Sequence, residues 1–232
     1  MSTGQEPLGT VHIRDMSSRP IRQGEPRWPA VVALLGATGL FFALPEALKV
    51  GPDWLIIVLV ALFSMPGLMF RQYRQLLIVQ ISGHAAVATA TLAMIGSLGL
   101  LVSRLPGHKE TPGQLLRAAA ALWVANVVVF AAWYWRLDAG GPHQRDLRGS
   151  HTDGAFLFPQ MTLDPRVREE MGEGDWSPHF IDYLFLAFNT STAFSPTDVP
   201  VLSRWAKMLM MVQSAISLAA IAILAARAIN IL

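Results

Sequence analysis

Residues 118–135 read AAAALWVANVVVFAAWYW, and this stretch contains no aspartate, glutamate, lysine or arginine. The hydrocarbon core of a bilayer is about 30 Å thick, and about 17–25 apolar residues of helix cross it. Four further windows free of those charged residues occur along the chain, at 28–45, 54–70, 76–102 and 208–226. Five windows of this length predict a membrane protein with several transmembrane helices.

The composition of the 232-residue chain agrees with this interpretation. Charged residues make up 15% of the chain and hydrophobic residues 53%, whereas a soluble domain carries about 25% charge. The absence of cysteine excludes disulfides and thiolate metal sites, and no run of lysines and arginines is long enough for a nucleic-acid surface. We therefore expect an all-α, polytopic protein whose partner is the lipid bilayer, with no nucleic-acid partner, cofactor or metal.

The distribution of charge divides the chain into four regions. Residues 1–27 are polar with both charge signs and predict a flexible N-terminal tail. Residues 28–135 hold the first four windows and predict a four-helix transmembrane bundle. Residues 136–178 form a polar, net acidic loop with a short apolar island at 156–159, which we expect to fold back onto the bundle. Residues 179–232 form the last region, which has a different pattern.

This last region contains a polar run between two apolar segments. Residues 179–188 predict a short apolar helix, and the polar run 189–198 separates it from the last window. About ten apolar residues are too few to cross a bilayer, and irregular backbone at membrane depth must be covered by protein or water. We therefore expect five transmembrane helices plus a short re-entrant helix before the last span. The alternative is six spans, with residues 179–196 crossing the membrane.

The run TSTAFSPTD, which begins at Thr190, resembles the pore-loop signature T-x-T-T-V-G-Y-G-D of tetrameric potassium channels without a gap. Thr190, Thr192 and Asp198 match the signature. Trp205 and Lys207 stand where those channels often carry a tryptophan and a basic residue. The resemblance covers about thirty residues and implies a pore helix, a filter loop and a lining helix, in that order.

The most specific positions of this signature are different here. Ser195 and Thr197 replace the two filter glycines, and Pro196 replaces the aromatic residue between them. A potassium filter coordinates ions with backbone carbonyls, and its backbone needs residues that readily accept positive φ. We therefore expect a degenerate filter that is not selective for potassium.

The chain also resembles a family of uncharacterised bacterial integral membrane proteins that is catalogued as a domain of unknown function. The residues that carry this resemblance are Phe156, Phe158, Pro159, Asp182, Tyr183, Ala187, Phe188, Asp198, Val201, Ser203, Arg204, Lys207 and Asn230. Two positions depart from the family pattern, Thr197 for the usual serine and Lys207 for arginine. The resemblance implies a multi-pass protein of the bacterial plasma (inner) membrane and carries no established activity.

Several polar residues are candidates for a pore. The filter candidates are Thr190, Ser191, Thr192, Ser195, Thr197 and Asp198, and the lining candidates of the last span are Gln213, Ser214 and Ser217. In an oligomer, copies of Asp198 would form an anionic ring that concentrates cations; alternatively, Asp198 caps the last helix or pairs with Arg204. The hydroxyls at 190–192 either line a hydrated cavity or satisfy the carbonyls at the end of a broken helix.

Other polar residues have mainly structural interpretations. We interpret Asp182, Arg204 and Lys207 as charge partners of the last region. Asn126 and Gln213 are expected to form hydrogen bonds between helices, which is the usual role of such residues in a membrane.

Two functions are compatible with these features. The first is an ion conduit formed by a homo-oligomer, with an inorganic cation as the permeating partner. The second is a non-conducting structural or partner-binding membrane protein. A transporter is a further alternative because broken helices also occur there, but the chain has no internal repeat. It also has no G-x-S-x-G, phosphate-binding glycine loop or H-E-x-x-H, so we expect neither an enzyme nor catalytic residues.

The lysines and arginines near the window ends are unevenly divided between the two sides of the membrane. The side of the N-terminal tail carries Arg14, Arg19, Arg22, Arg27, Arg71 and Arg74, and the opposite side carries Lys49, Arg104, Lys109 and Arg117. The positive-inside rule favours a cytoplasmic N-terminus. A pore loop that enters from outside requires the opposite orientation, so the sequence leaves the orientation open.

Overall fold

The fold is given by a computed structural model, which describes residues 25–69, 76–104, 111–148, 151, 153–174, 176–192 and 199–229. Within these ranges the chain is built from helices and contains no β-strand, which confirms the all-α prediction. A single isolated bridge joins Phe156 to Val201.

Three helices are long and apolar enough to cross a membrane. They are α3 (Leu76–Arg104), α4 (Pro112–Leu137) and α9 (Arg204–Ile229). All three coincide with windows that the sequence predicted as spans. Because these helices match a bilayer in length and composition, the chain has the features of a membrane protein.

The first two predicted spans are shorter apolar helices. Helix α1 covers Trp28–Gly39 and continues as a 3-10 turn, η2, over Leu40–Ala43. The backbone then becomes extended at Leu44, because a residue before proline disfavours the helical conformation. A second 3-10 turn, η3 (Glu46–Leu48), leads to α2 (Asp53–Met69).

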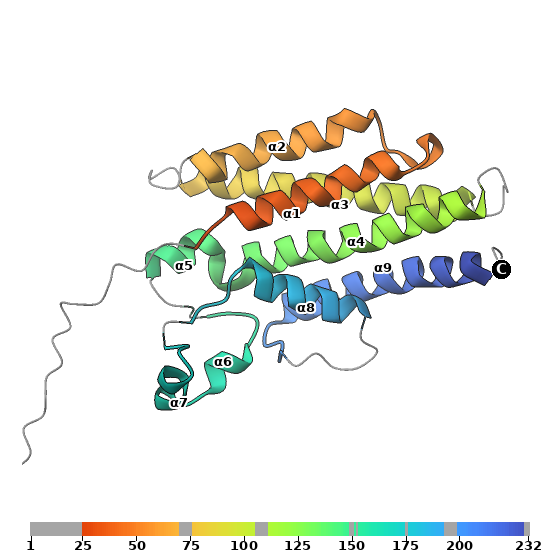
Figure 1. The fold of residues 1–232 in the computed structure, drawn as a ribbon. Coiled ribbons are helices and arrows are strands. Elements are labelled where there is room, and N and C mark those ends of the chain that lie inside the picture. Colours follow the sequence, from red (N-terminus) through yellow and green to blue (C-terminus); the bar gives the residue numbers. More distant parts are fainter. Residues whose placement is uncertain are drawn as a thin grey trace, which may run out of the picture.

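Helix α4 is the central element of the bundle (Figure 1). It packs against α1 and α3 on one side and α9 on the other, and α2 lies against α1 and α3 at the outer edge. Of the apolar window of α4, 61% is buried, compared with 22% for α9. Of the three long helices, α9 therefore has the least buried apolar window, and its exposed side is available to lipid or to another copy of the chain.

The polar region after α4 contains short helices rather than a continuous loop. They are η5 (Asp138–Gly140), α5 (Pro142–Arg148), α6 (Pro159–Thr162) and α7 (Pro165–Glu170), and they gather at one end of the bundle (Figure 1). Gly141 has φ +86°, and a Cβ atom there would lie 2.6 Å from the Arg136 carbonyl oxygen. Only glycine permits this sharp reversal after α4.

The apolar island at 156–159 packs onto the bundle, as predicted. Phe156 and Phe158 are buried, and both rings contact the ring of Tyr183. Tyr183 belongs to α8 (Phe180–Thr192), a helix of 13 residues that packs against α4 and α9. The island therefore fixes the start of α8 against the end of the bundle.

Candidate functional site

The polar side chains of α8, α9 and α4 meet inside the protomer. Gln213 on α9 is fully buried, and its amide nitrogen donates to the Ala187 carbonyl (2.7 Å) and to the Ser191 hydroxyl (2.8 Å). The Tyr134 hydroxyl donates to its amide oxygen. The Asn126 side chain donates to the Gln213 carbonyl at 3.2 Å, so the predicted bonds between helices are confirmed for both Asn126 and Gln213.

The same face of α9 satisfies carbonyl groups at the C-terminal end of α8. The Ser217 hydroxyl donates to the Ser191 carbonyl (2.7 Å), and the Ser214 hydroxyl donates to the Thr190 carbonyl (3.3 Å). The Trp123 indole in turn donates to the Ser217 hydroxyl (2.9 Å). The last carbonyls of a helix lack partners within that helix. Here α9 supplies partners for two of them, the Thr190 and Ser191 carbonyls.

Two of the three described filter candidates use their hydroxyls within α8, whereas the Ser191 hydroxyl accepts from Gln213 on α9. Thr190 donates to the Leu186 carbonyl (2.8 Å) and Thr192 donates to the Phe188 carbonyl (2.9 Å). Thr190 is buried, whereas Thr192 is exposed. This geometry agrees with the interpretation that the hydroxyls satisfy carbonyls of a short helix. The candidates Ser195, Thr197 and Asp198 lie outside the described residues.

The three predicted charge partners lie at the starts of α8 and α9. The Asp182 carboxylate accepts a hydrogen bond from the His179 amide (2.7 Å), which is half of a capping box. Burial raises the pKa of Asp182, and this hydrogen bond opposes the rise. Arg204 and Lys207 are exposed in the first turn of α9. The pairing of Arg204 with Asp198 stays a prediction, because Asp198 is not described.

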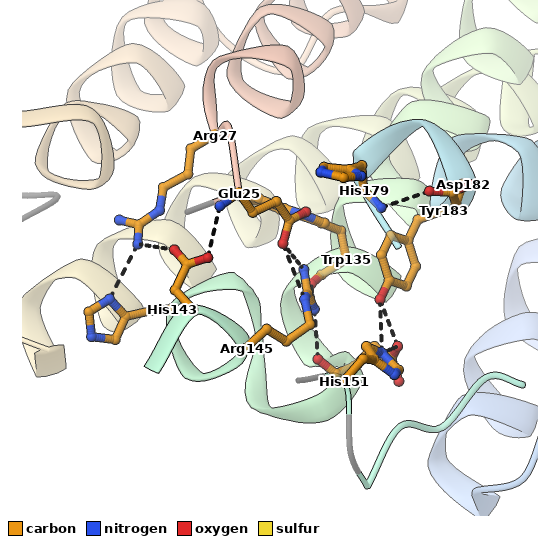
Figure 2. A network of polar contacts seen from close by, with 11 residues as sticks. Glu25, Arg27, Trp135, His143, Arg145, His151, His179, Asp182 and Tyr183 are labelled. Atoms are coloured by element: carbon orange, nitrogen blue, oxygen red, sulfur yellow. Dashed lines mark hydrogen bonds and ion pairs between the residues drawn. The ribbon is translucent and has the colours of Figure 1, made fainter. Parts of the chain in front are cut away.

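A second polar cluster, which the sequence did not predict, lies where α4 ends, and we call it the Asp138 network (Figure 2). The Asp138 carboxylate is fully buried. It accepts hydrogen bonds from the Tyr183 hydroxyl (2.7 Å), the His151 ring (2.7 Å) and the Ala155 amide. Burial, together with the neighbouring Asp138, raises the pKa of Tyr183 against the opposing charge of Arg145. The Tyr183 hydroxyl therefore stays protonated and donates.

Arg145 on α5 links this network to the chain that precedes α1. Its guanidinium makes two hydrogen bonds to one Glu25 carboxylate oxygen, of 2.7 and 3.2 Å, and both side chains are buried. It also donates to the carbonyls of Trp135 (3.0 Å) and Asp138 (2.8 Å), which lie at the end of α4. The Trp135 indole donates to Glu25. This buried ion pair therefore also caps the end of α4.

Arg27 connects the start of α1 to α2 and α5. It donates to the Gly67 carbonyl (3.2 Å), bonds the His143 ring (3.2 Å) and lies 3.6 Å from the Asp146 carboxylate. The predicted N-terminal tail was expected to be flexible up to residue 27. Its last residues are instead part of the folded bundle, because Glu25 and Arg27 are buried and paired.

The arrangement of the Asp138 network is that of a structural clamp. Among the described residues, no group of three His, Asp or Glu side chains could hold a metal ion. The network ties α4, α5, α8 and the segment before α1 together.

Comparisons with protein-family models, with curated proteins and with solved structures found no match to this chain. The functional proposal below is therefore based on the geometry of this chain alone.

Proposed function

We propose that the chain is a multi-pass protein of the bacterial inner membrane with five transmembrane helices and a re-entrant helix, α8. We further propose that a homo-oligomer of it forms an ion conduit with a weak preference for cations. The observation that supports this proposal is the position of α8 relative to α9, which corresponds to that of a pore helix and its lining helix.

The starts of α8 and α9 are held at the same level of α4. Tyr183, in the first turns of α8, bonds Asp138 at the end of α4. The segment before α9 pairs with the apolar island, through the Leu157 amide to the Pro200 carbonyl (3.0 Å) and the Leu202 amide to the Ala155 carbonyl (2.7 Å). Since the Ala155 amide itself bonds Asp138, both helices begin beside this one residue.

The end of α8 lies far from that level. The Ser191 carbonyl accepts from Ser217, which is 13 residues beyond Arg204 on α9. A helix rises 1.5 Å per residue, so Ser217 lies about 20 Å along α9 from its start. Helix α8 therefore ends about this far from the level where both helices begin, and this arrangement supports the proposed re-entrant course.

Charge supports a cytoplasmic position for the shared start of α8 and α9. This end of the bundle carries Arg27, Arg136, Arg145, Arg148, Arg204 and Lys207, and the described residues of the other end carry Lys49, Arg104, Arg117 and Arg227. The positive-inside rule counts lysine and arginine near span ends. The re-entrant helix would accordingly enter from the cytoplasm.

The topology can be tested with single cysteines, since the chain has none of its own. Glu170 and Leu202 are exposed on either side of α8, and Glu46 is exposed at the opposite end of the bundle. We expect the cysteines of E170C and L202C to react with a membrane-impermeant maleimide from the cytoplasmic side, and that of E46C from the other side. Reaction of L202C from the same side as E46C would instead establish six spans.

Conduction is tested with the purified protein in liposomes. We expect cation flux, and we expect Asp198→Asn to lower the preference for cations because it removes an anionic ring. Asp153→Asn is the matched control, since this aspartate is exposed outside the bundle, and it should leave selectivity unchanged. Absence of flux across voltage and pH, or a stable monomer in native-like lipid, would contradict the conduit.

A second candidate function, that of a non-conducting structural or partner-binding protein, is favoured by the burial of two predicted lining residues. Gln213 and Ser217, predicted to line a conduit, are buried inside the protomer and hydrogen-bonded to α8. Only Ser214 and Thr192 among the described candidates are exposed. A non-conducting protein in which α8 is a structural plug would have this geometry, and it would give a folded monomer without flux in the same two measurements.

A further inference from the structure

A small open cavity of about 40 Å³ lies between the start of α1, the end of α2, the start of α3 and the end of α4. Its polar lining residues are Arg27, Ser64, Gln80, His84, Arg136 and His143. A buried water needs about 10–15 Å³ of such space, so the cavity has room for about three water-sized groups. A tetrahedral oxyanion occupies a comparable space, and the rest of a larger ligand could extend through the opening.

The cavity carries an excess of positive charge. Arg27 lies 3.6 Å from Asp146, but within the described part of the chain Arg136 has no carboxylate in ion-pair contact. The Arg136 guanidinium lies over the Trp135 ring (5.4 Å) and experiences Arg27 as a like charge. A charge removed from water is costly unless it is paired. An anion between the two guanidinium groups would supply that pairing.

The position of Arg136 depends on a glycine in α3. A Cβ atom at Gly83 would lie 1.8 Å from a terminal nitrogen of Arg136. The guanidinium therefore rests directly on the backbone of α3, beside the cavity, where any larger residue at position 83 would displace it. Its planar set of donors suits two oxygens of one phosphate group.

Neutral hydrogen-bonding groups complete the lining. Nδ1 of His84 donates to the Gln80 carbonyl (2.7 Å), so in the neutral ring the other nitrogen is an acceptor and can bond a phosphate oxygen that carries a proton. The buried Ser64 hydroxyl has no hydrogen-bond partner among the described residues. Trp28, the residue after Arg27, is 63% exposed, and an exposed tryptophan at the start of an apolar helix is typical of the level of lipid headgroups.

We propose that this cavity binds the phosphate group of an anion, with Arg136 and Arg27 as its charged contacts. The phosphate belongs either to the headgroup of an anionic phospholipid or to a free phosphate ion. Basic pockets between transmembrane helices on the cytoplasmic side bind lipid headgroups in this way. The site is separate from the α8–α9 module and does not depend on conduction.

The test measures thermal unfolding of the full-length protein in a non-ionic detergent while ligand is added. The ligands are phosphatidylglycerol, phosphatidylcholine and inorganic phosphate, and binding to the folded state raises the Tm. We expect Arg136→Gln to lower the affinity for the stabilising ligand by about 10- to 100-fold, because the substitution removes a charged hydrogen bond. Arg166→Gln, an equal charge change on the exposed surface of α7, should respond like the wild type.

The ligands distinguish the two sources of the phosphate. Stabilisation by phosphatidylglycerol alone assigns the site to a headgroup, and stabilisation by inorganic phosphate assigns it to the free ion. Gly83→Ala should reproduce the loss with no change in charge, which covers the case in which Arg136→Gln fails to fold. Equal responses of the wild type, Arg136→Gln and Gly83→Ala to every ligand would overturn the proposal.

Discussion

An Asp138→Ala variant should unfold at a temperature about 10 °C below that of the wild-type protein in the same detergent. The Asp138 carboxylate is fully buried and accepts from Tyr183, His151 and the Ala155 amide. Alanine leaves these three donors without an acceptor, and breaking a buried polar cluster of this kind costs about 3–5 kcal/mol. For a chain of this size, each kcal/mol lowers the Tm by about 2–4 °C.

Two further substitutions separate the lost hydrogen bonds from the lost charge. Asp138→Asn keeps one carbonyl acceptor, so the Tm should fall by less than in Asp138→Ala. Asp153→Asn removes a charge from an aspartate whose side chain is 92% exposed in the same polar region, and its effect should stay within about 0.5 kcal/mol. Equal Tm values for Asp138→Ala and Asp153→Asn would contradict the central role of Asp138.

The second large effect is expected for Arg145→Met, with a loss of about 3–5 kcal/mol in the free energy of unfolding. This change leaves the buried Glu25 carboxylate without its cation and removes the donor to the Trp135 and Asp138 carbonyls. Denaturant or thermal unfolding of the purified protein measures the loss. Arg148→Met on the same short helix is the control, since Arg148 is more exposed and lies 3.9 Å from Asp153.

A double variant tests whether the ion pair accounts for the loss. In Glu25→Gln/Arg145→Met the uncompensated carboxylate is gone, so the double variant should be less destabilised than the two single losses added together. The shortfall measures the coupling between the two side chains. Additive losses would mean that Arg145 acts only as a cap of α4 and not as the partner of Glu25.

The long helices could be predicted because their signal is local. The windows at 76–102, 118–135 and 208–226 contain no charge, and each lies within a helix of the structure. The first window was expected to continue to residue 45, but α1 ends at Gly39 and a 3-10 turn follows. A hydrophobic window gives the extent of apolar chain and not the type of helix that the chain forms.

The Asp138 network could not be predicted because its pairs are distant in sequence. Glu25 and Arg145 are 120 positions apart, and no local pattern marks either as buried. A signal was present at Asp138, an acidic residue that directly follows the apolar and aromatic end of α4. The sequence also placed Gln213 and Ser217 correctly on one face of the last helix. It could not indicate that α8 and α4 of the same chain cover this face.

The pairing of Glu25 with Arg145 has a consequence for biosynthesis. A ribosome adds about 5–20 residues per second, so Arg145 is made roughly 6–24 seconds after Glu25. During that interval the chain of α1 to α4 has been made and can enter the membrane, but the partner of Glu25 does not exist. The N-terminal segment can therefore attach only after α1 to α4 have been made, and a ribosome that stalls before α5 would leave Glu25 without its partner.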